Sequence, residues 1–462
     1  MKGTAIIGTV HHRSELIEAL RSSAGRLTGS RHELDAIVEA AAQHRVVLIG
    51  EATHGTHEFH RMRMDITRRL ITEAGFTVVA AEADWPDAHR VDRYVRGLGD
   101  DHDALASLGD FARFPAWMWR HSDMLDFVAW LRAHNDSRAW GDRPVRFVGL
   151  DLYSLRSSIA AVIEYLDRVD PDEAAAARKR YACFDHVGAQ GQAYGLAIAT
   201  RAVLPCEDEV VTQLVRLRAM ADQLARRDGD SALDEYFSAE QNAVVIRDAE
   251  EYYQQMFRAD VSAWNLRDRH MAATLTAVME HLDSRRGSHP HPDVKAVVWA
   301  HNSHVGDARA TGMATRGELN LGELVRRRDD RDAFVIGFTS YDGTVAAAPD
   351  WDGPVRKRAL RPGLPGSLEE LLHHVGRDGE PDLWFDCRDH RVRAALGDLR
   401  LQRAVGVVYR PQTERASHYL TTRVVDQFDL LIHLDRTSAI EPLETGEHWN
   451  RADTPDTYPT GV

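Results

Sequence analysis

The clearest pattern along the chain is a set of short apolar runs, each about as long as a buried strand. Three of these runs span residues 46–49, 76–82 and 294–300. A short apolar run bounded by glycine or polar residues is typical of an interior strand in a parallel sheet. The segment between the first two runs, residues 56–74, is followed by a glycine and predicts a helix. The pattern therefore predicts strand–helix–strand units.

Later apolar runs extend the sheet, and one long segment lacks them. Further strands are predicted at residues 145–150, 333–339, 382–385, 404–408 and 430–434, and helices at residues 14–22, 115–134 and 367–374. From residue 154 to residue 281 the apolar positions follow a helical period instead. We therefore predict an α/β fold with a largely parallel central sheet, helices on both faces and a large helical insert over the carboxyl edge of the sheet.

The same pattern divides the chain into parts. We expect an N-terminal extension over residues 1–33, an α/β catalytic core over residues 34–153 and 288–443, a helical insert over residues 154–287 and a flexible tail over residues 444–462. The tail is rich in Thr, Gly, Asp and Pro, a composition typical of poorly ordered termini. The insert is placed where it could cover the mouth of a site on the core.

Composition and charge exclude several classes of function. The net charge of −14 argues against a nucleic acid or an anionic membrane as partner, because either would call for a basic surface. No apolar run reaches the roughly eighteen residues that a membrane helix needs, and the apolar run near the N-terminus is too short for a signal peptide. The three cysteines, Cys183, Cys206 and Cys387, match no zinc or redox spacing. We therefore expect no disulfide and a cytoplasmic protein.

Residues that carry acid–base chemistry follow the first three apolar runs. Glu51 and His54 come just after the first run, Glu82 closes the second, and His301 and His304 follow the third. Because the carboxyl ends of parallel strands meet at one edge of a sheet, we expect these five side chains to lie close together. One polar residue at a strand end means little, whereas three such ends indicate a common site.

The motifs around these residues resemble those of a known family. They are GEATHGT at residues 50–56, EADW at 82–85, WMWR at 117–120, GLD at 149–151, WAHNSHVGD at 299–307 and GELNLG at 317–322. In this order they resemble the erythromycin esterase family, over residues 35–443 of the chain. The resemblance implies a metal-independent hydrolase of a carboxylic ester or lactone. It also implies that the catalytic base is His54 and that Arg63 is an active-site arginine.

The chain lacks the serine motif of the common α/β hydrolases. No serine has glycines two residues away on both sides, so a covalent serine mechanism is disfavoured. His54 is then the best candidate for a general base that activates water directly. Glu51 and Glu82 could hold its tautomer and stabilise the imidazolium that forms. Arg63 could polarise an ester carbonyl or anchor a carboxylate, or serve only as an ion-pair partner.

His301 and His304 leave two hypotheses open. They could donate hydrogen bonds to an oxyanion or position the attacking water. Together with His54 and Glu82 they could instead bind zinc. We favour the first hypothesis, because zinc enzymes usually carry histidines four residues apart on a helix or a cysteine framework. We therefore expect no metal and no cofactor.

Aromatic residues near the motifs are candidates for substrate binding. Trp85, Trp117 and Trp119 could line a large apolar pocket, although tryptophan in such places often packs in a core instead. His57 shares a helix face with Arg63 and is a further candidate.

The function that we expect is hydrolysis of a small-molecule ester or lactone, and the family name suggests a macrolide-type ring as the substrate. One alternative is a hydrolase of another small molecule in secondary metabolism, including a metal-dependent one. The other is a non-catalytic small-molecule-binding protein, for which the set of acids and imidazoles would be superfluous. The sequence leaves the oligomeric state open.

Overall fold

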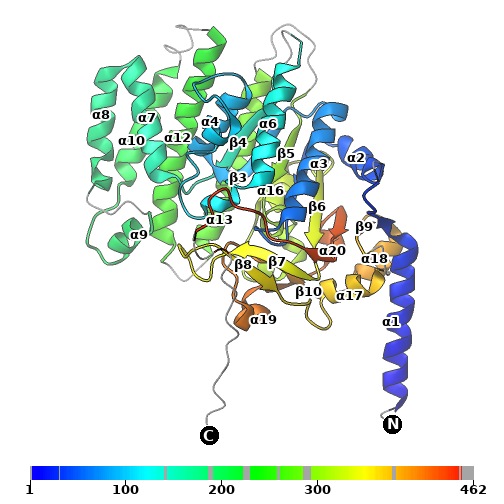
Figure 1. Cartoon of the computed structure of the whole chain (residues 1–462). Coiled ribbons are helices and arrows are strands. Elements are labelled where there is room, and N and C mark those ends of the chain that lie inside the picture. Colours follow the sequence, from blue (N-terminus) through cyan, green and yellow to red (C-terminus); the bar gives the residue numbers. More distant parts are fainter. Residues whose placement is uncertain are drawn as a thin grey trace.

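The structure is a computed structural model, and Figure 1 shows how its elements are arranged. It describes residues 3–30, 32–139, 143–185, 191–221, 229–257, 261–284, 293–376, 381–446 and 449. The predicted boundary between insert and core at residues 287–288 lies outside the described residues. So does the predicted tail beyond residue 446, apart from Trp449.

The centre of the molecule is an eight-stranded sheet in the order β1-β9-β12-β6-β2-β5-β3-β4. Its strands are β1 (Gly25–Arg26), β2 (Val46–Ile49), β3 (Val78–Asp84), β4 (Arg146–Asp151), β5 (Ala296–Trp299), β6 (Ala333–Thr339), β9 (Leu383–Asp386) and β12 (Leu430–His433). The six strands from β12 to β4 run parallel, whereas β9 is antiparallel to β12 and β1 is antiparallel to β9. The predicted α/β class with a largely parallel sheet is confirmed.

The sheet is buried on both faces because the side chains of its strands alternate between two apolar cores. Val47 and Ile49 of β2 pack into one core, and Val46 and Leu48 pack into the other. The first core is covered mainly by α2 (Asp35–Ala42), α3 (His57–Ala74), α4 (Trp85–Val95) and α6 (Ser122–Asp136). The second is covered mainly by α1 (Gly3–Ser23), α13 (Ser262–Ser284), α16 (Leu321–Arg328), α17 (Leu368–Val375), α18 (His390–Leu396) and α20 (Val424–Gln427).

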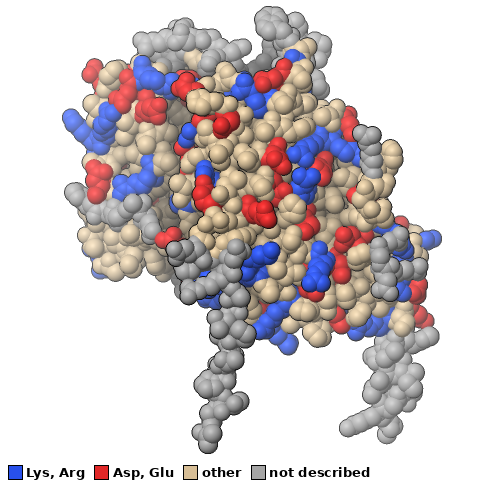
Figure 2. Space-filling model, viewed as in Figure 1, with Lys and Arg blue, Asp and Glu red and all other residues tan. Residues whose placement is uncertain are grey.

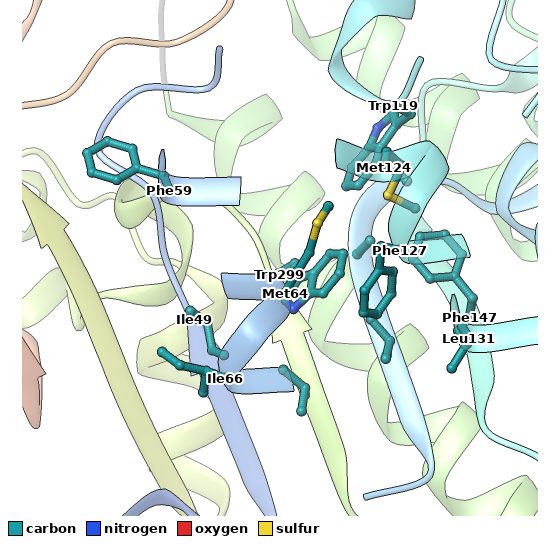
Figure 3. Packing of buried hydrophobic residues seen from close by; sticks show 14 of the residues in the cluster. Ile49, Phe59, Met64, Ile66, Trp119, Met124, Phe127, Leu131, Phe147 and Trp299 are labelled. Carbon is teal, nitrogen blue, oxygen red and sulfur yellow. The ribbon is translucent and has the colours of Figure 1, made fainter. Parts of the chain in front are cut away.

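Trp299, the last residue of β5, is fully buried in the first core. Figure 3 shows it among labelled residues of β2, α3, α6 and β4. Its ring lies 4.7 Å from the ring of Phe127, centroid to centroid, and its indole N–H donates to Thr67 Oγ1 at 3.0 Å. This packing holds the end of β5, and so it holds the loop that carries His301 and His304.

The helical insert forms a compartment with its own apolar core. Its elements are α7 (Leu155–Val169), α8 (Pro171–Tyr181), η2 (Ala182–Phe184), α9 (Gly191–Ala199), α10 (Glu207–Ala219), α12 (Gly229–Gln255) and α13. The described residues of this part contain helices and no strand, as the helical period predicted. Figure 1 shows α7, α8, α10 and α12 together on the side of the molecule where α4 lies, with α7 and α12 in contact with α4, while α13 returns to pack on the sheet itself.

Beyond the carboxyl edge lie two small sheets. One contains β7 (Asp342–Ala347), β8 (Arg356–Leu360) and β13 (Arg436–Thr437), and the other contains β10 (Arg400–Arg403) and β11 (Tyr419–Thr422). The predicted strand at residues 404–408 is wrong, because β10 ends at Arg403. The segment after it forms only isolated bridges, Val405 with Thr53 and Val408 with Ala348. Its backbone hydrogen bonds therefore go to loops instead of a neighbouring strand.

Two predicted helices have different bounds in the structure. The helix predicted at residues 115–134 is divided into η1 (Ala116–Met118) and α6, because His121 between them is extended. The N-terminal helix α1 is longer than predicted, and Arg21 near its end donates to two carbonyls at the end of α17. The remaining short helices are α5 (Ala104–Ser107), α14 (Asn302–Val305), η3 (Ala308–Ala310), α15 (Gly312–Thr315), η4 (Pro411–Thr413) and α19 (Glu414–Ser417).

The cysteine prediction is wrong. Cys183 of η2 and Cys206 before α10 form a disulfide, with their Cα atoms 6.1 Å apart, whereas Cys387 is free and buried. The chain folds back between α8 and α10, and this brings together two cysteines whose spacing in sequence matches no known motif. The argument from cysteine usage to a reducing compartment therefore fails.

Charged side chains of both signs lie on the surface of the molecule. Figure 2 shows acidic and basic side chains interspersed over the face seen in Figure 1. Among the described residues, no helix combines the length and the apolar character needed to cross a lipid bilayer.

Candidate active site

Three neighbouring strands bring the predicted acids and imidazoles together. β2, β5 and β3 lie side by side in the sheet, so the segments at their carboxyl ends meet. The rings of His54 and His301 are 4.8 Å apart, centroid to centroid, and the backbone N–H of His301 donates to Glu82 Oε2 at 2.8 Å. His304 Nε2 lies 3.4 Å from Glu82 Oε1. Glu82 itself belongs to β3, two residues before the end of the strand.

Close backbone contacts shape the loop that carries His54. A Cβ atom at Gly50 would lie 2.1 Å from Asn302 Oδ1, and one at Gly55 would lie 1.9 Å from the carbonyl oxygen of Ala346 in β7. Only glycine leaves room for these approaches. On the other side, the backbone N–H of His54 donates to the carbonyl of Val405 at 3.2 Å. The irregular segment after β10 thus fastens the loop that carries His54.

The hydrogen bonds of His54 identify its tautomer. Its Nδ1 lies 3.0 Å from Glu51 Oε1, and because an ionised carboxylate only accepts, Nδ1 carries the hydrogen. Its Nε2 has no hydrogen-bond partner among the described residues, and His54 lines the main cleft. The neutral side chain therefore presents the lone pair of Nε2 to the cleft.

Glu51 is buried behind His54 in a cluster of nitrogen donors. It is 1% exposed, and Arg63 Nη1 and His60 Nε2 lie 3.3 Å and 3.4 Å from its carboxylate oxygens. Burial alone would raise the pKa of Glu51, but the charge of Arg63 and the hydrogen bond from His54 outweigh it and lower the pKa to about 2. Glu51 is therefore a permanent anion at neutral pH.

Arg63 and His60 support this anion from α3. The Nε2–H of His60 donates to the carbonyl of His54 at 3.0 Å, so its Nδ1 can accept from Arg63 Nη2, also at 3.0 Å. Burial, His121 and Arg63 hold the pKa of His60 well below its ordinary value. The guanidinium of Arg63 lies 5.0 Å from the centre of the Trp299 ring and is 1% exposed. Arg63 thus lies behind Glu51, and it does not line the cleft.

His301 lines the cleft, but both of its ring nitrogens are engaged. Its Nε2 lies 3.2 Å from the carbonyl of Ala52, to which it donates, and its Nδ1 accepts from the hydroxyl and the backbone N–H of Ser303. Burial and the neighbouring His54 lower the pKa of His301 to about 3. His301 is therefore neutral, and it ties the loop after β5 to the loop after β2.

His304 belongs to a second charged network that the sequence revealed only in part. Its Nδ1–H donates to Asp268 at 2.9 Å and 3.0 Å, and its ring stacks on Trp264. Arg267 Nη1 lies 3.0 Å from His304 Nε2, closer than the carboxylate of Glu82, so in the neutral form Nε2 accepts from Arg267. Burial alone would lower the pKa of His304, but Asp268 and Glu82 outweigh it and raise the pKa.

Arg267 joins the strand ends of β3 and β4. It donates to Asp151 Oδ1 and Oδ2 at 2.9 Å and 2.7 Å and to Glu82 Oε1 at 2.6 Å. Burial alone would raise the pKa of Glu82, but His304, Arg267 and His54 outweigh it and lower the pKa. Sequence reasoning missed Arg267 and Asp268, which lie within the long helix α13. Asp151 could have been found, because it ends an apolar strand.

These networks border a cleft of about 420 Å³, a volume typical of small-molecule sites. His54, Glu82, His301 and His304 line one side of it. Aromatic and apolar side chains line much of the rest, including Phe111, Met118, Trp119, Met313, Trp351 and Leu420. The helical insert contributes Trp264 and Arg267 of α13, and no other of its described residues lines the cleft.

Of the four predicted substrate-binding residues, only Trp119 lines the cleft. Trp85 contacts Ser238 and Phe237 of α12, and Trp117 is buried in the first core. His57 lies at the start of α3, where Asp123 accepts a hydrogen bond from its Nδ1 at 2.7 Å. Within the described part of the chain, no group of three or more His, Cys, Asp or Glu residues is arranged to hold a metal ion.

Two known proteins are similar in sequence to this chain. The chain is 21% identical over 409 residues to the putative hydrolase YbfO of Bacillus subtilis (strain 168), covering 85% of this chain and 83% of that protein. It is 23% identical over 355 residues to erythromycin esterase type II of Escherichia coli, covering 72% of this chain and 78% of that protein.

Two solved structures share the fold. A Bacillus cereus protein has a TM-score of 0.72 and 20% identity and covers 94% of this chain and 99% of its own. A mutant of the erythromycin esterase EreC in its open conformation has a TM-score of 0.64 and 16% identity, and covers 90% of this chain and 96% of its own.

The sequence also matches the erythromycin esterase family directly, over residues 71–437. Glu51, His54 and Arg63 precede the matched segment, so their assignment depends on the geometry described above. Because the match spans most of the chain, this protein belongs to the erythromycin esterase family, and its relatives indicate a hydrolase.

Proposed function

We propose that the protein hydrolyses a carboxylic ester or a lactone with a water molecule that His54 activates directly. The observation that supports this most is the orientation of His54, whose Nδ1–H is held by Glu51 at 3.0 Å while Nε2 is free on the cleft side. A neutral imidazole held in this way offers a lone pair to a water molecule in the cleft, as a general base requires.

In the proposed reaction, Nε2 of His54 takes a proton from water while the water oxygen attacks the carbonyl carbon. The carboxylate of Glu51 stabilises the imidazolium that forms, and it remains ionised because its pKa is low. The tetrahedral intermediate then collapses, the bond from carbon to the alkoxy oxygen breaks, and His54 returns the proton to that oxygen. An ester yields an acid and an alcohol, and a lactone yields one hydroxy acid.

Two other parts of the site complete the proposal. His304 and Arg267 lie beside Glu82 and line the cleft. Arg267 carries a positive charge and His304 can carry one, so we assign both to stabilising the negative oxygen of the tetrahedral intermediate. We assign His301 to holding the catalytic loop, because both of its nitrogens bind within the protein. Arg63 then acts through Glu51 and does not touch the substrate.

The substrate proposed first is a macrolide-type ring. This rests on the relative named erythromycin esterase type II and on the large, partly aromatic cleft. Fold and family alone do not determine the substrate, because related sites can act on different molecules.

A panel assay tests the proposal. Purified protein would be incubated with macrolides and with chromogenic esters, with and without prolonged treatment with a chelator, and products would be identified by mass spectrometry. We expect the mass of one added water in a macrolide or in another lactone, and the same rate after chelation. Loss of activity on chelation and its recovery with zinc would indicate that a metal-bound hydroxide attacks the ester, and not a water molecule activated by His54. Binding without turnover of any ester would favour a binding protein.

A further inference from the structure

A second cavity lies at the amino edge of the sheet, opposite the edge that carries the cleft. It has a volume of about 180 Å³ and lies between α13, α16 and the points where β2 and β6 begin. None of the described residues that line it also lines the cleft. The cavity is therefore a separate space that the proposed hydrolysis does not use.

Apolar side chains form the floor of this cavity. They are Ala272, Leu275 and Met279 of α13, Leu324 and Val325 of α16, and Val46 of β2. Val46, Leu275 and Met279 are each less than a tenth exposed. An engineered apolar cavity of about 150 Å³ in another protein binds benzene. A cavity of this size and lining therefore suits a single ring or a small fused ring.

The rim of the cavity carries more carboxylates than cations. Both of its arginines already bind a carboxylate of α13, in the pairs Arg45–Asp283 and Arg328–Glu280. Asp329 and Asp332 also line the cavity, and neither forms an ion pair with a described residue. An anionic ligand would meet this excess of negative charge, whereas a hydroxyl or N–H group could donate to a carboxylate. The rim thus favours an uncharged ligand with a hydrogen-bond donor.

Arg328 bridges the two helices at the surface beside the cavity. Its Nη2 donates to Glu280 Oε1 at 2.9 Å, and both side chains are more than half exposed. Exposed ion pairs contribute little to stability, so a ligand can displace this one as it enters.

The two helices that form the cavity are joined to each other at the candidate active site. Asp268 of α13 accepts from His304 Nδ1 at 2.9 Å and from the backbone N–H of Leu321, the first residue of α16, at 2.8 Å. The cavity begins about one turn beyond this junction on each helix, at Ala272 and Leu324. A change in the spacing of the helices at the cavity therefore reaches the donors that Asp268 binds.

We propose that this cavity is a second small-molecule site, which binds an uncharged, mainly apolar molecule with one hydrogen-bond donor, of the size of a phenol or an indole. Its occupant acts on His304 through the junction at Asp268. The proposal goes beyond the proposed hydrolysis, and the binding does not depend on it.

Two phenols that differ in one group test the class of ligand. The probes are 4-methylphenol and 4-hydroxybenzoate, which have nearly the same shape, but only the second is an anion near pH 7. Binding to the whole protein would be measured by NMR titration. We expect 4-methylphenol to bind at least about tenfold more tightly, because the carboxylate would have to lie against apolar side chains or beside the carboxylates of the rim.

Matched variants locate the bound phenol. Ala272→Leu places a larger apolar side chain in the cavity and should weaken the binding of 4-methylphenol at least about tenfold. Ala273→Leu places the same side chain at the next position of α13, which is exposed and does not line the cavity, and should leave binding unchanged. Leu324→Phe fills the cavity from α16 and serves if Ala272→Leu folds poorly.

The coupling has a readout that needs no turnover. In protein with isotope-labelled histidine, the imidazole signals of His304 are those lost in His304→Gln. Saturation with 4-methylphenol should shift these signals in the wild type and in Ala273→Leu, but not in Ala272→Leu. The cavity-filling variant thus separates an effect of the cavity from binding of the phenol in the cleft.

Four results would count against the proposal. Equal affinity for the two phenols would overturn the class of ligand, and absence of binding up to the solubility limit would overturn the site. Equal affinity of 4-methylphenol for the wild type, Ala272→Leu and Leu324→Phe would also overturn the site, because the ligand would then lie elsewhere. Binding in the cavity without a shift of the His304 signals would overturn the coupling. All four results stand whether or not the protein hydrolyses an ester.

Discussion

Replacement of Glu51 by glutamine tests how His54, the proposed base, is held. The carboxylate of Glu51 accepts from Nδ1–H of His54 at 3.0 Å, which leaves Nε2 unprotonated. Glutamine has nearly the same shape, but its amide can donate to Nδ1 and stabilise the opposite tautomer. In that tautomer Nε2 carries the hydrogen and cannot take a proton from water.

The expected loss of activity is large and comes with a loss of stability. An equivalent acid-to-amide change in a hydrolytic triad lowers kcat by about 10⁴-fold, and we expect a similar loss with little change in KM. The pKa of Glu51 falls from 4.5 to about 2 on folding, which corresponds to about 3 kcal/mol of stability. Because the pKa is lowered, this stability is present above pH 4.5 and is lost as the pH falls through about 2. The Glu51→Gln variant should lack this contribution to stability at neutral pH.

The assay combines steady-state kinetics on an ester that the wild type hydrolyses with urea unfolding at several pH values. Glu73→Gln is the matched control, because Glu73 is an exposed carboxylate near the end of α3 and does not line the cleft. Glu51→Asp keeps the charge and should recover part of the activity if Glu51→Gln folds poorly. A folded Glu51→Gln protein with kcat within about tenfold of the wild type would refute the tautomer argument.

The remaining predictions concern the second network, the catalytic loop and the cleft wall. Asp268→Asn should lower the pKa of His304, because Asp268 raises it, and an unchanged imidazole titration by NMR would contradict this. Gly55→Ala should destabilise the fold by about 1–3 kcal/mol in urea unfolding, since its Cβ would lie 1.9 Å from the carbonyl of Ala346; an unchanged midpoint would count against the contact. Trp351→Ala should raise KM for large apolar esters with kcat unchanged, and equal effects on small esters would disprove its role in the cleft.

The central half of the sheet and the convergence of Glu51, His54, Glu82, His301 and His304 could be predicted from the sequence for one physical reason. Parallel strands are buried on both faces, so they are visible as continuous apolar runs, and their carboxyl ends share one edge. The runs that end near Glu51, Glu82 and His301 are neighbours in the sheet, so the predicted convergence follows from strand order. The helical insert could be predicted for a similar reason, because its apolar residues recur with the period of an α-helix.

Residues whose position depends on long-range packing could not be predicted. Arg267 and Asp268 lie inside α13, where charged residues usually face solvent, and only the docking of that helix on the sheet brings them to the site. The segment after Arg403 contains apolar residues but pairs with loops, so its composition suggested a strand. Trp85 and Trp117 have the side chains of a binding pocket, yet they pack in the interior.

The most direct test of the central claim is the activity of His54→Ala. On an ester that the wild type hydrolyses, the account predicts a loss of kcat of about 10²–10⁴-fold, because Nε2 of His54 is the proposed base for water. KM should change little, since the base contacts mainly the water, and circular dichroism should confirm that the variant is folded. A folded His54→Ala protein that hydrolyses the same ester at close to the wild-type rate would contradict the account.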